Sequence, residues 1–385
     1  MSGWIVHRPD RPKPYLARYQ PRGGRVVSKS FRNKTGKGGA EEWLRTQSVD
    51  NSRGEWVDPR RGDLTLGEWS ERWLTGRRVR PSTMARDESV IRNLIVPQLG
   101  GRRLNAITPD ELREWVAGLE AAGKAPATVR KAYQLAAAMI GQAVDDGRLA
   151  RSPLPRRIDM PSPNTEPMRI ITLAEAHHLA DMIDPRSRVL VLTAVYTGLR
   201  FGELAGLRTD KVDLMRRAIT VTATLSEVRG DVSLTEPKTP RSKRRVAISP
   251  NLTDELAAHI AEHGSHGWVF PAAAGGPMRR TNFRRRVWLP ATVAADLEGL
   301  WFHDLRHTHA AALIAQGEHP KVIAERLGHS SIRVTMDIYG HLMPGMDADA
   351  ADRLDVAWSV AAEETRTKRA PNPPVPFPRT GENPL

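Results

Sequence analysis

The segment that decides how this chain is interpreted runs Trp301-Phe302-His303-Asp304-Leu305-Arg306-His307-Thr308-His309. His303, Arg306 and His307 are groups that transfer protons or bind anions, and they are close together at the expected start of a helix. A metal site is the first alternative, because His303 and His307 are four residues apart and can share a helix face. The chain has no cysteine and lacks the helix-borne His-Glu-x-x-His pattern, so we favour acid–base and anion-binding chemistry.

Three other segments carry residues of similar chemistry. Arg200 and Glu203 follow a glycine at an expected helix junction, within Thr-Gly-Leu-Arg-Phe-Gly-Glu-Leu. Lys238 occupies an expected turn between two strands, within Glu-Pro-Lys-Thr-Pro. His329 follows the helix stop Leu-Gly, and Tyr339 comes ten residues later. Taken singly, each of these residues is more simply explained as surface or packing.

Taken in order, the segments resemble the active-site series of the tyrosine recombinase (phage integrase) family. The resemblance covers residues 169–345 and rests on Thr-Gly-Leu-Arg-x-x-Glu-Leu, His-Asp-Leu-Arg-His and Leu-Gly-His-Ser-Ser, followed by a tyrosine at the family's distance. It implies an enzyme that cuts and rejoins DNA strands through a 3′-phosphotyrosine intermediate. It further implies integration or excision of a phage or mobile element, with type IB topoisomerase-like chemistry and no cofactor or metal.

The resemblance assigns the phosphoryl-transfer roles. Tyr339 is the nucleophile, and Arg200 and Arg306 bind the non-bridging oxygens of the scissile phosphate. Lys238 is the general acid that protonates the departing 5′-oxygen. Lys243, five residues further on, is the competing choice for this acid.

The remaining site residues also follow from the resemblance. His303 receives the proton of the attacking tyrosine, and His329 donates a hydrogen bond to the phosphate. Glu203 orients Arg200 or His303 from behind. His307 fits the family pattern as a structural support, and a final histidine, His309, is expected to be packing.

The rest of the chain predicts a multidomain α+β protein. A small N-terminal three-stranded sheet plus helix is expected in residues 1–62, with Gly23-Gly24 as a hairpin turn. A helical core-site-binding domain is expected in residues 64–155, where Thr108 to Glu111 form a capping box. A mainly helical catalytic domain with a small antiparallel sheet is expected in residues 169–345, followed by a C-terminal tail, 346–385.

Within the catalytic domain, hydrophobic patterning predicts individual elements. Helices are expected over residues 173–183, 186–197, 202–206 and 253–263, and strands over 218–225, 232–235 and 245–248. Leu327-Gly328 is expected to end a helix, and Ser330 or Ser331 to cap the next one.

Charge and composition point to the same class of partner. Lysine and arginine number 58 against 44 acidic residues, a net charge of +14, and residues 1–62 hold 14 of these cations against six acids. A folded basic protein of this kind most often binds nucleic acid. No apolar leader segment and no run of 18 uncharged apolar residues is present, and the lack of cysteine fits a reducing compartment. We therefore expect a cytoplasmic protein without a membrane partner, and the resemblance further implies a bacterial host and association with the nucleoid.

The resemblance also implies partners. They are double-stranded DNA, bound at core sites by residues 64–155 and at arm-type sites by residues 1–62, and further copies of the chain in a homotetramer on DNA. Residues 346–385 would be exchanged between protomers, and a host DNA-bending factor and an excisionase are further family partners. The arginine-rich runs at 241–245 and 279–286 are expected to contact the DNA backbone.

Two alternatives remain open. A resolvase or chromosome-dimer recombinase shares the chemistry but normally lacks a domain like residues 1–62. A DNA-binding relative with an inactive catalytic domain is the other alternative, although every expected catalytic position holds a competent residue type.

Overall fold

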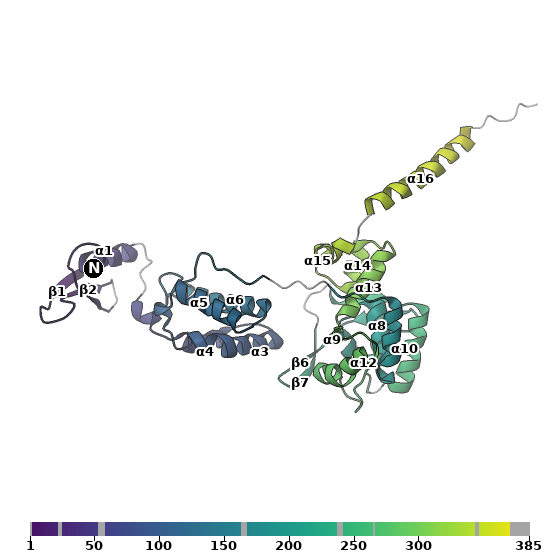
Figure 1. The fold of residues 1–385 in the computed structure, drawn as a ribbon, viewed down its shortest axis with the longest axis horizontal. Coiled ribbons are helices and arrows are strands. Elements are labelled where there is room, and N and C mark those ends of the chain that lie inside the picture. Colours follow the sequence, from purple (N-terminus) through teal and green to yellow (C-terminus); the bar gives the residue numbers. More distant parts are fainter. Residues whose placement is uncertain are drawn as a thin grey trace, which may run out of the picture. The chain divides into compact units, whose positions relative to one another are not determined.

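The computed structural model of the chain describes residues 2–21, 25–52, 58–162, 168–236, 242–264, 266–342 and 346–369. The chain divides into two compact units, Met1–Pro167 with Val228–Gly230, and Met168–Glu227 with Asp231–Leu385. The first unit contains an N-terminal sheet and a helical domain, and the second contains the expected catalytic domain (Figure 1). Among the described helices, none combines the length and apolar character needed to cross a membrane.

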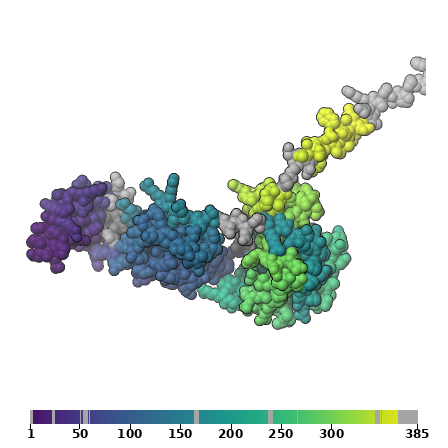
Figure 2. Space-filling view, in the orientation of Figure 1, coloured from purple at the N-terminus to yellow at the C-terminus, as the bar shows by residue number. Residues whose placement is uncertain are grey.

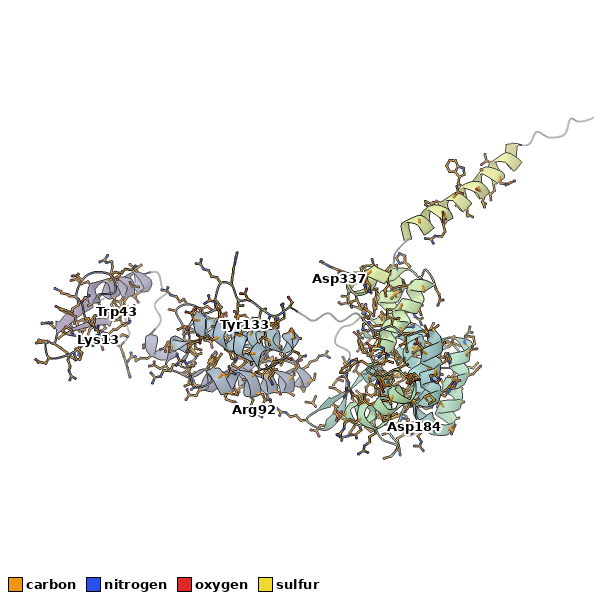
Figure 3. The ribbon with its side chains drawn as sticks, viewed as in Figure 1. Lys13, Trp43, Arg92, Tyr133, Asp184 and Asp337 are labelled. Carbon is orange, nitrogen blue, oxygen red and sulfur yellow. The ribbon has the colours of Figure 1, made fainter. Side chains whose placement is uncertain are left out.

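The N-terminal region forms the expected three-stranded sheet with one helix. Its elements are β1 (Ser2–His7), β2 (Tyr15–Gln20), β3 (Val27–Phe31) and α1 (Ala40–Ser52). The strands are antiparallel in the order β1-β2-β3, with Tyr15 opposite both His7 and Phe31. Trp43 of α1 packs against Phe31, with ring centroids 5.9 Å apart (Figure 3). The expected hairpin glycines, Gly23-Gly24, lie outside the described residues.

The helical domain follows. Its elements are α2 (Leu66–Gly76), α3 (Pro81–Val90), a π-helical turn (Ile91–Ile95), α4 (Val96–Leu99), α5 (Pro109–Ala121) and α6 (Pro126–Asp145), with short 3₁₀ turns at Pro59–Gly62 and Leu104–Ala106. The capping box of Thr108 with Glu111 is confirmed at the start of α5, and Thr65 with Glu68 forms a second one at α2. Apolar faces of these helices, including Trp69 and Trp115, meet in a single core.

One charged group is fully buried in this helical core. The carboxylate of Asp87, on α3, is 2.7 Å from Arg77 Nη2 and 2.9 Å from Lys131 Nζ. Burial opposes its ionisation, but hydrogen bonds from Lys131 and Arg77 outweigh burial, so the pKa of Asp87 is lowered. The ion cluster therefore ties the start of the domain to α6.

The catalytic domain is built around one helix that is buried on nearly all sides. This helix is α8 (Pro185–Thr197), against which α7 (Leu173–Met182), α10 (Pro250–His263) and α13 (Asp304–Ala315) pack. The remaining helices are α9 (Phe201–Ala205), α11 (Arg280–Phe283), a π-helical turn (Arg284–Trp288), α12 (Leu289–Ala294), α14 (Pro320–Leu327) and α15 (Ile332–Tyr339), with 3₁₀ turns at Thr209–Lys211 and Gly340–Leu342. A capping box of Thr172 with Glu175 begins α7.

The small strands of this domain form two separate sheets. One is antiparallel with the order β4-β5-β8, from β4 (Val212–Asp213), β5 (Ala218–Val221) and β8 (Arg244–Ala247). The other is the hairpin of β6 (Thr224–Val228) and β7 (Asp231–Thr235). The single strand expected over residues 218–225 is therefore wrong: the chain leaves one sheet after Val221 and joins the other at Thr224.

Two further features bear on the site. α14 and α15 form a small second core with α13, in which Ala310, Ile323 and Leu327 surround Tyr339. Gly328 ends α14 in the left-handed conformation as expected, whereas Ser331 precedes α15 without a side-chain capping bond.

The described part of the tail is a helix, α16 (Met346–Arg369). In Figure 2 the surface of residues 168–342 mixes teal and green, so segments far apart in sequence share it.

Candidate active site

The junction between α8 and α9 directs the first arginine. Gly198 ends α8 with φ +66°, and a Cβ there would lie 2.6 Å from Leu327 Cδ2 and 2.7 Å from His309 Cδ2. Only glycine fits both this left-handed turn and this close approach. The turn places Arg200 at the N-cap of α9, with its side chain 39% exposed. Arg200 therefore reaches solvent from a rigid helix start.

Glu203 lies beneath Arg200, almost completely buried. One carboxylate oxygen accepts the Arg200 backbone N–H at 2.8 Å, and the other accepts Arg200 Nη1 at 3.1 Å. Arg244 of β8 donates to both oxygens at 3.0 Å from its two terminal nitrogens. Burial opposes ionisation, but the hydrogen bond and charge of Arg244 and the charge of Arg200 lower the pKa of Glu203. Glu203 is thus an anion that orients Arg200.

Arg244 is the site residue that sequence reasoning missed. The arginine-rich run at 241–245 was expected to contact DNA, but the side chain of Arg244 is only 6% exposed and is committed to Glu203. Its Nε also donates to the carbonyl oxygen of Arg326 at 2.7 Å, at the end of α14. The expectation is therefore wrong for Arg244. The alternating burial of β8, in which Arg244 and Val246 share a parity, is the only local signal that could have separated it from its neighbours.

Arg306 lies at the centre of the site on α13 and is 3% exposed. Its Nη1 donates to the carbonyl oxygen of Gly198 at 2.7 Å and its Nη2 to that of Leu327 at 2.5 Å. One guanidinium therefore ties the α8–α9 turn to the end of α14. Burial, together with the nearby positive charge of Arg200, lowers the pKa of Arg306 to about 9, so it remains cationic at pH 7.

The two histidines on this face of α13 differ in position. His303 precedes the helix and reaches solvent, whereas His307 is half-buried one turn later. Their rings meet edge to face with centroids 5.0 Å apart. His307 Nδ1 shares a hydrogen bond of 2.9 Å with the hydroxyl of Tyr339, at the end of α15. The hydroxyl of the expected nucleophile therefore contacts His307 directly.

Tyr339 is itself 1% exposed, and burial raises its pKa although Arg306 and Arg200 oppose this. Its ring is parallel to that of His329 within 9°, with centroids 6.5 Å apart. His329 follows the left-handed Gly328, and its Nδ1 lies 2.8 Å from Thr335 Oγ1. Burial and the charge of Arg306 lower the pKa of His329 to about 4, so this ring is neutral at pH 7.

His309 takes no part in this cluster and is packing, as expected. Its Nδ1 is 2.8 Å from the carbonyl oxygen of Val195 on α8, and Arg326 Nε lies 3.5 Å from its Nε2. Burial lowers the pKa of His309 to about 3. It therefore joins α13 to α8 as a neutral group.

The expected general acid cannot be placed in the same way. Lys238 lies outside the described residues, and its role stays a prediction. The competing Lys243 is half exposed, with its Nζ 3.3 Å from Glu236 Oε1. Across the described ranges, no group of three or more histidine or acidic residues could hold a metal ion. The structure thus brings together Arg200, Glu203, Arg306 and the aromatic residues His303, His307, His329 and Tyr339.

Two family models match the chain. A model described as the phage integrase family matches residues 168–345, and one described as the phage integrase N-terminal SAM-like domain matches residues 65–119. These matches cover the catalytic domain and most of the helical domain.

Curated relatives agree with the models. The ICEBs1 integrase of Bacillus subtilis is 35% identical over 185 residues, which are 44% of this chain and 50% of that protein. A prophage phiRv2 integrase of Mycobacterium tuberculosis is 27% identical over 352 residues, which are 88% of this chain and 92% of the relative. The second alignment extends over nearly the whole of both proteins.

Solved structures share the fold. The Tn1549 transposon integrase in complex with transposon right end DNA superposes with a TM-score of 0.64 at 22% identity, covering 76% of this chain and 100% of that one. A lambda integrase tetramer bound to a Holliday junction superposes with a TM-score of 0.54 at 18% identity, covering 84% of this chain and 92% of that one.

Proposed function

Because the chain belongs to the phage integrase family of tyrosine recombinases, we propose that it is a site-specific integrase whose covalent nucleophile is Tyr339. The observation that carries this proposal is that three motif segments meet at Arg306, whose charge acts on Tyr339 together with that of Arg200. The α8–α9 turn, α13 and the end of α14 are tied together by Arg306, and α15 brings the Tyr339 hydroxyl to His307.

The chemistry needs no external energy source. Attack of the Tyr339 oxygen on a phosphodiester breaks the bond to the 5′-oxygen and stores its energy in a 3′-phosphotyrosyl bond. A 5′-hydroxyl from another strand then reverses the step and releases the tyrosine. Strand exchange therefore proceeds without net hydrolysis.

The arginines meet the charge that develops on the phosphate. Arg200 is partly exposed and fixed by Glu203, so its guanidinium is available to a non-bridging oxygen. Arg306 is held by two carbonyl oxygens and supplies a second, immobile cation beside Tyr339. Each arginine is preorganised, so little reorganisation is needed when the transition state forms.

His329 and Lys238 complete the proposed catalytic set. If the Thr335 hydroxyl donates to His329 Nδ1, the other ring nitrogen carries hydrogen and can donate to a phosphate oxygen. Lys238 remains the proposed general acid for the 5′-oxygen, because its Pro-Lys-Thr context matches that of the family's turn lysine. His303, at the N-cap of α13, is exposed to solvent.

We further propose double-stranded DNA and copies of the chain as partners. The structures of the Tn1549 and lambda integrases contain DNA, and the latter is a tetramer. Residues 64–155 and the catalytic domain would bind core-site DNA, and the basic residues 1–62 would bind arm-type sites. Leu354 and Trp358 of α16 are 71% and 76% exposed one turn apart, which suits exchange of the tail between protomers.

A suicide substrate tests the proposal. The purified chain is incubated with a nicked duplex of its attachment core, whose short 5′ fragment diffuses away after cleavage and traps the adduct. We expect a covalent protein–DNA product with the wild type and none with Tyr339→Phe. Failure of the wild type to form the adduct, or an adduct with the phenylalanine variant, would refute the assignment and favour an inactive DNA-binding relative.

A further inference from the structure

The hydroxyl of Tyr339 has one hydrogen-bond partner in the described structure, and it is His307. The distance from Tyr339 Oη to His307 Nδ1 is 2.9 Å, and the two rings are tilted by 60° with centroids 5.7 Å apart. His303 instead faces His307 edge-on. The resemblance implies that His303 receives the tyrosine proton, but the hydrogen bond along which a proton can move leads to His307.

We propose that His307, and not His303, accepts the phenolic proton of Tyr339 during strand cleavage. This inference rests on the proposed function. As the Tyr339 oxygen bonds to phosphorus, its O–H bond breaks and the proton moves to His307 Nδ1, while the bond from phosphorus to the 5′-oxygen breaks. The general acid protonates the 5′-oxygen. On rejoining, the imidazolium of His307 returns the proton to the tyrosine.

The tautomer needed for this step is chemically ordinary. His307 accepts at Nδ1 when its remaining hydrogen is on Nε2, and the tyrosine hydroxyl then donates. Burial raises the pKa of Tyr339, so the phenol is protonated at rest and needs an acceptor at the moment of attack. A partner already at hydrogen-bond distance removes the need for a water or a rearranged side chain.

Electrostatics favour His307 over His303 as the base. Burial lowers the pKa of both rings, which keeps both neutral at pH 7. For His307 the carboxylate of Asp304 opposes the shift, although Arg306 adds to it. For His303, His307 and three arginines add to the effect of burial and lower its pKa to about 4. The carboxylate of Asp304 therefore favours uptake of a proton by His307. The titratable and charged groups that face the pair are His329 and Tyr339 on the α14–α15 side, Arg280 of α11, Arg200 of α9, and Asp304 and Arg306 of α13.

The competing explanation is that the contact only stores the nucleophile. Tyr339 is 1% exposed, so the hydrogen bond could hold it away from DNA until the site is assembled. The two explanations predict opposite effects of losing the base. A stored tyrosine is released when the contact weakens, whereas a tyrosine without its proton acceptor attacks more slowly.

The experiment is single-turnover cleavage of the nicked core-site duplex between pH 5 and pH 9. His307→Asn is the informative variant, because its amide oxygen can replace Nδ1 as a hydrogen-bond acceptor but cannot take up a proton. We expect cleavage slower by about 10²–10⁴-fold, the usual contribution of a general base. The wild-type rate should fall as the pH drops through the pKa of His307, and this acid limb should be absent from the variant. Added imidazole should partly restore cleavage by His307→Gly.

Two controls separate this role from others. A substrate with sulfur in place of the bridging 5′-oxygen has a leaving group that needs no proton, so it should rescue Lys238→Ala and leave His307→Asn slow. His303→Asn should keep the acid limb of the wild type. Melting temperatures establish that each variant is folded.

Three results would overturn the inference. They are cleavage by His307→Asn as fast as the wild type or faster, rescue of this variant by the sulfur substrate, and loss of the acid limb in His303→Asn alone. An adduct formed by Tyr339→Phe would instead refute the proposed function, so the two failures are distinguishable.

Discussion

Among the residues that the structure describes, two carboxylates are buried between cations, one in each of two domains. Asp87 of the helical domain is fully buried, but its partners Arg77 and Lys131 are 24% and 29% exposed. Glu203 of the catalytic domain is 3% exposed, and its partner Arg244 is only 6% exposed. The cations of Asp87 can therefore regain water if the pair is broken, whereas Arg244 cannot.

The two ion pairs also differ in the residues that they contact beyond the pair. Arg77 stacks over Trp73, with its guanidinium 4.3 Å from the ring centroid, within the helical domain. Glu203 instead accepts a hydrogen bond from Arg200 and so holds in place a partly exposed side chain that we propose to bind the phosphate. The same ion-pair chemistry thus supports stability in one domain and both stability and catalytic geometry in the other.

The largest effect is expected from Glu203→Gln. The substitution leaves the charge of Arg244 buried without its counterion, which destabilises the catalytic domain by about 3 kcal/mol. Loss of the fixed position of Arg200 should slow strand cleavage on the order of 10²-fold. Urea unfolding and suicide-substrate cleavage measure the two effects. A folded variant that cleaves at the wild-type rate would remove the distinction between Glu203 and Asp87.

The second-largest effect is expected from acid, which should destabilise the catalytic domain at a higher pH than the helical domain. Eleven of the twelve histidines lie in residues 168–342, and none lies in residues 58–162. His309 has a folded pKa of about 3, so between pH 6.5 and 3 the unfolded chain binds a proton that the folded chain does not. The contribution of the neutral His309 ring to the stability of the catalytic domain is therefore fully present above pH 6.5 and is lost as the pH falls below it. For His309 alone the loss is about 2 kcal/mol between pH 7 and pH 5.

Segment-resolved hydrogen exchange, corrected for the intrinsic effect of pH on amide exchange, tests this prediction. Amides of α8 and α13 should lose protection at pH 5, and those of α6 should not. Equal loss in both domains would show that the buried histidines are not the cause. Because the pKa of Asp87 is lowered in the folded chain, its ion pairs stabilise the helical domain at neutral pH. This contribution is lost only at more acidic pH, below the ordinary aspartate value.

Asp87→Asn should have a smaller effect than Glu203→Gln. Because Arg77 and Lys131 can be solvated again, we expect a loss of about 1–2 kcal/mol in the stability of the helical domain. Cleavage per bound complex should be unchanged, because no proposed catalytic residue contacts Asp87. The measurements are calorimetric melting and single-turnover cleavage at saturating protein, and slower cleavage at saturation would contradict the comparison.

The smallest effect is expected for the exposed pair of Asp110 and Arg113 on α5. Their side chains are 84% and 50% exposed. Surface pairs of this kind contribute less than about 1 kcal/mol, so Asp110→Asn should leave both melting and cleavage close to the wild type. A melting shift as large as that of Asp87→Asn would mean that burial does not govern these ion pairs.

The catalytic cluster could be predicted because its members lie in short, ordered motifs. Arg200 with Glu203, His303 with Arg306, and the glycine before His329 keep spacings that one helix turn or one helix end imposes. Arg244 could not be found in this way. Its neighbours Lys243 and Arg245 are exposed. Apart from the parity that Arg244 shares with Val246, only the pairing with Glu203, 41 residues earlier, distinguishes it from them.

The same limit applies to the small sheets. Residues 218–225 are strand-forming throughout, and local propensity has no means of showing that Val221 and Thr224 belong to different sheets. The pairing of β5 with β8, which is far along the chain, determines the break.

By itself, the sequence predicted the family, the order of the domains and most of the residues that the structure brings together, because each prediction depends on local spacing, capping and composition. The tertiary structure alone decided which histidine contacts Tyr339 and which arginine is buried behind Glu203. Hydrogen bonds and burial depend on distances between segments that lie far apart in the chain, and no local pattern encodes those distances. That is why the motif points to His303, whereas the fold places His307 of α13 against the proposed nucleophile, Tyr339, at the end of α15.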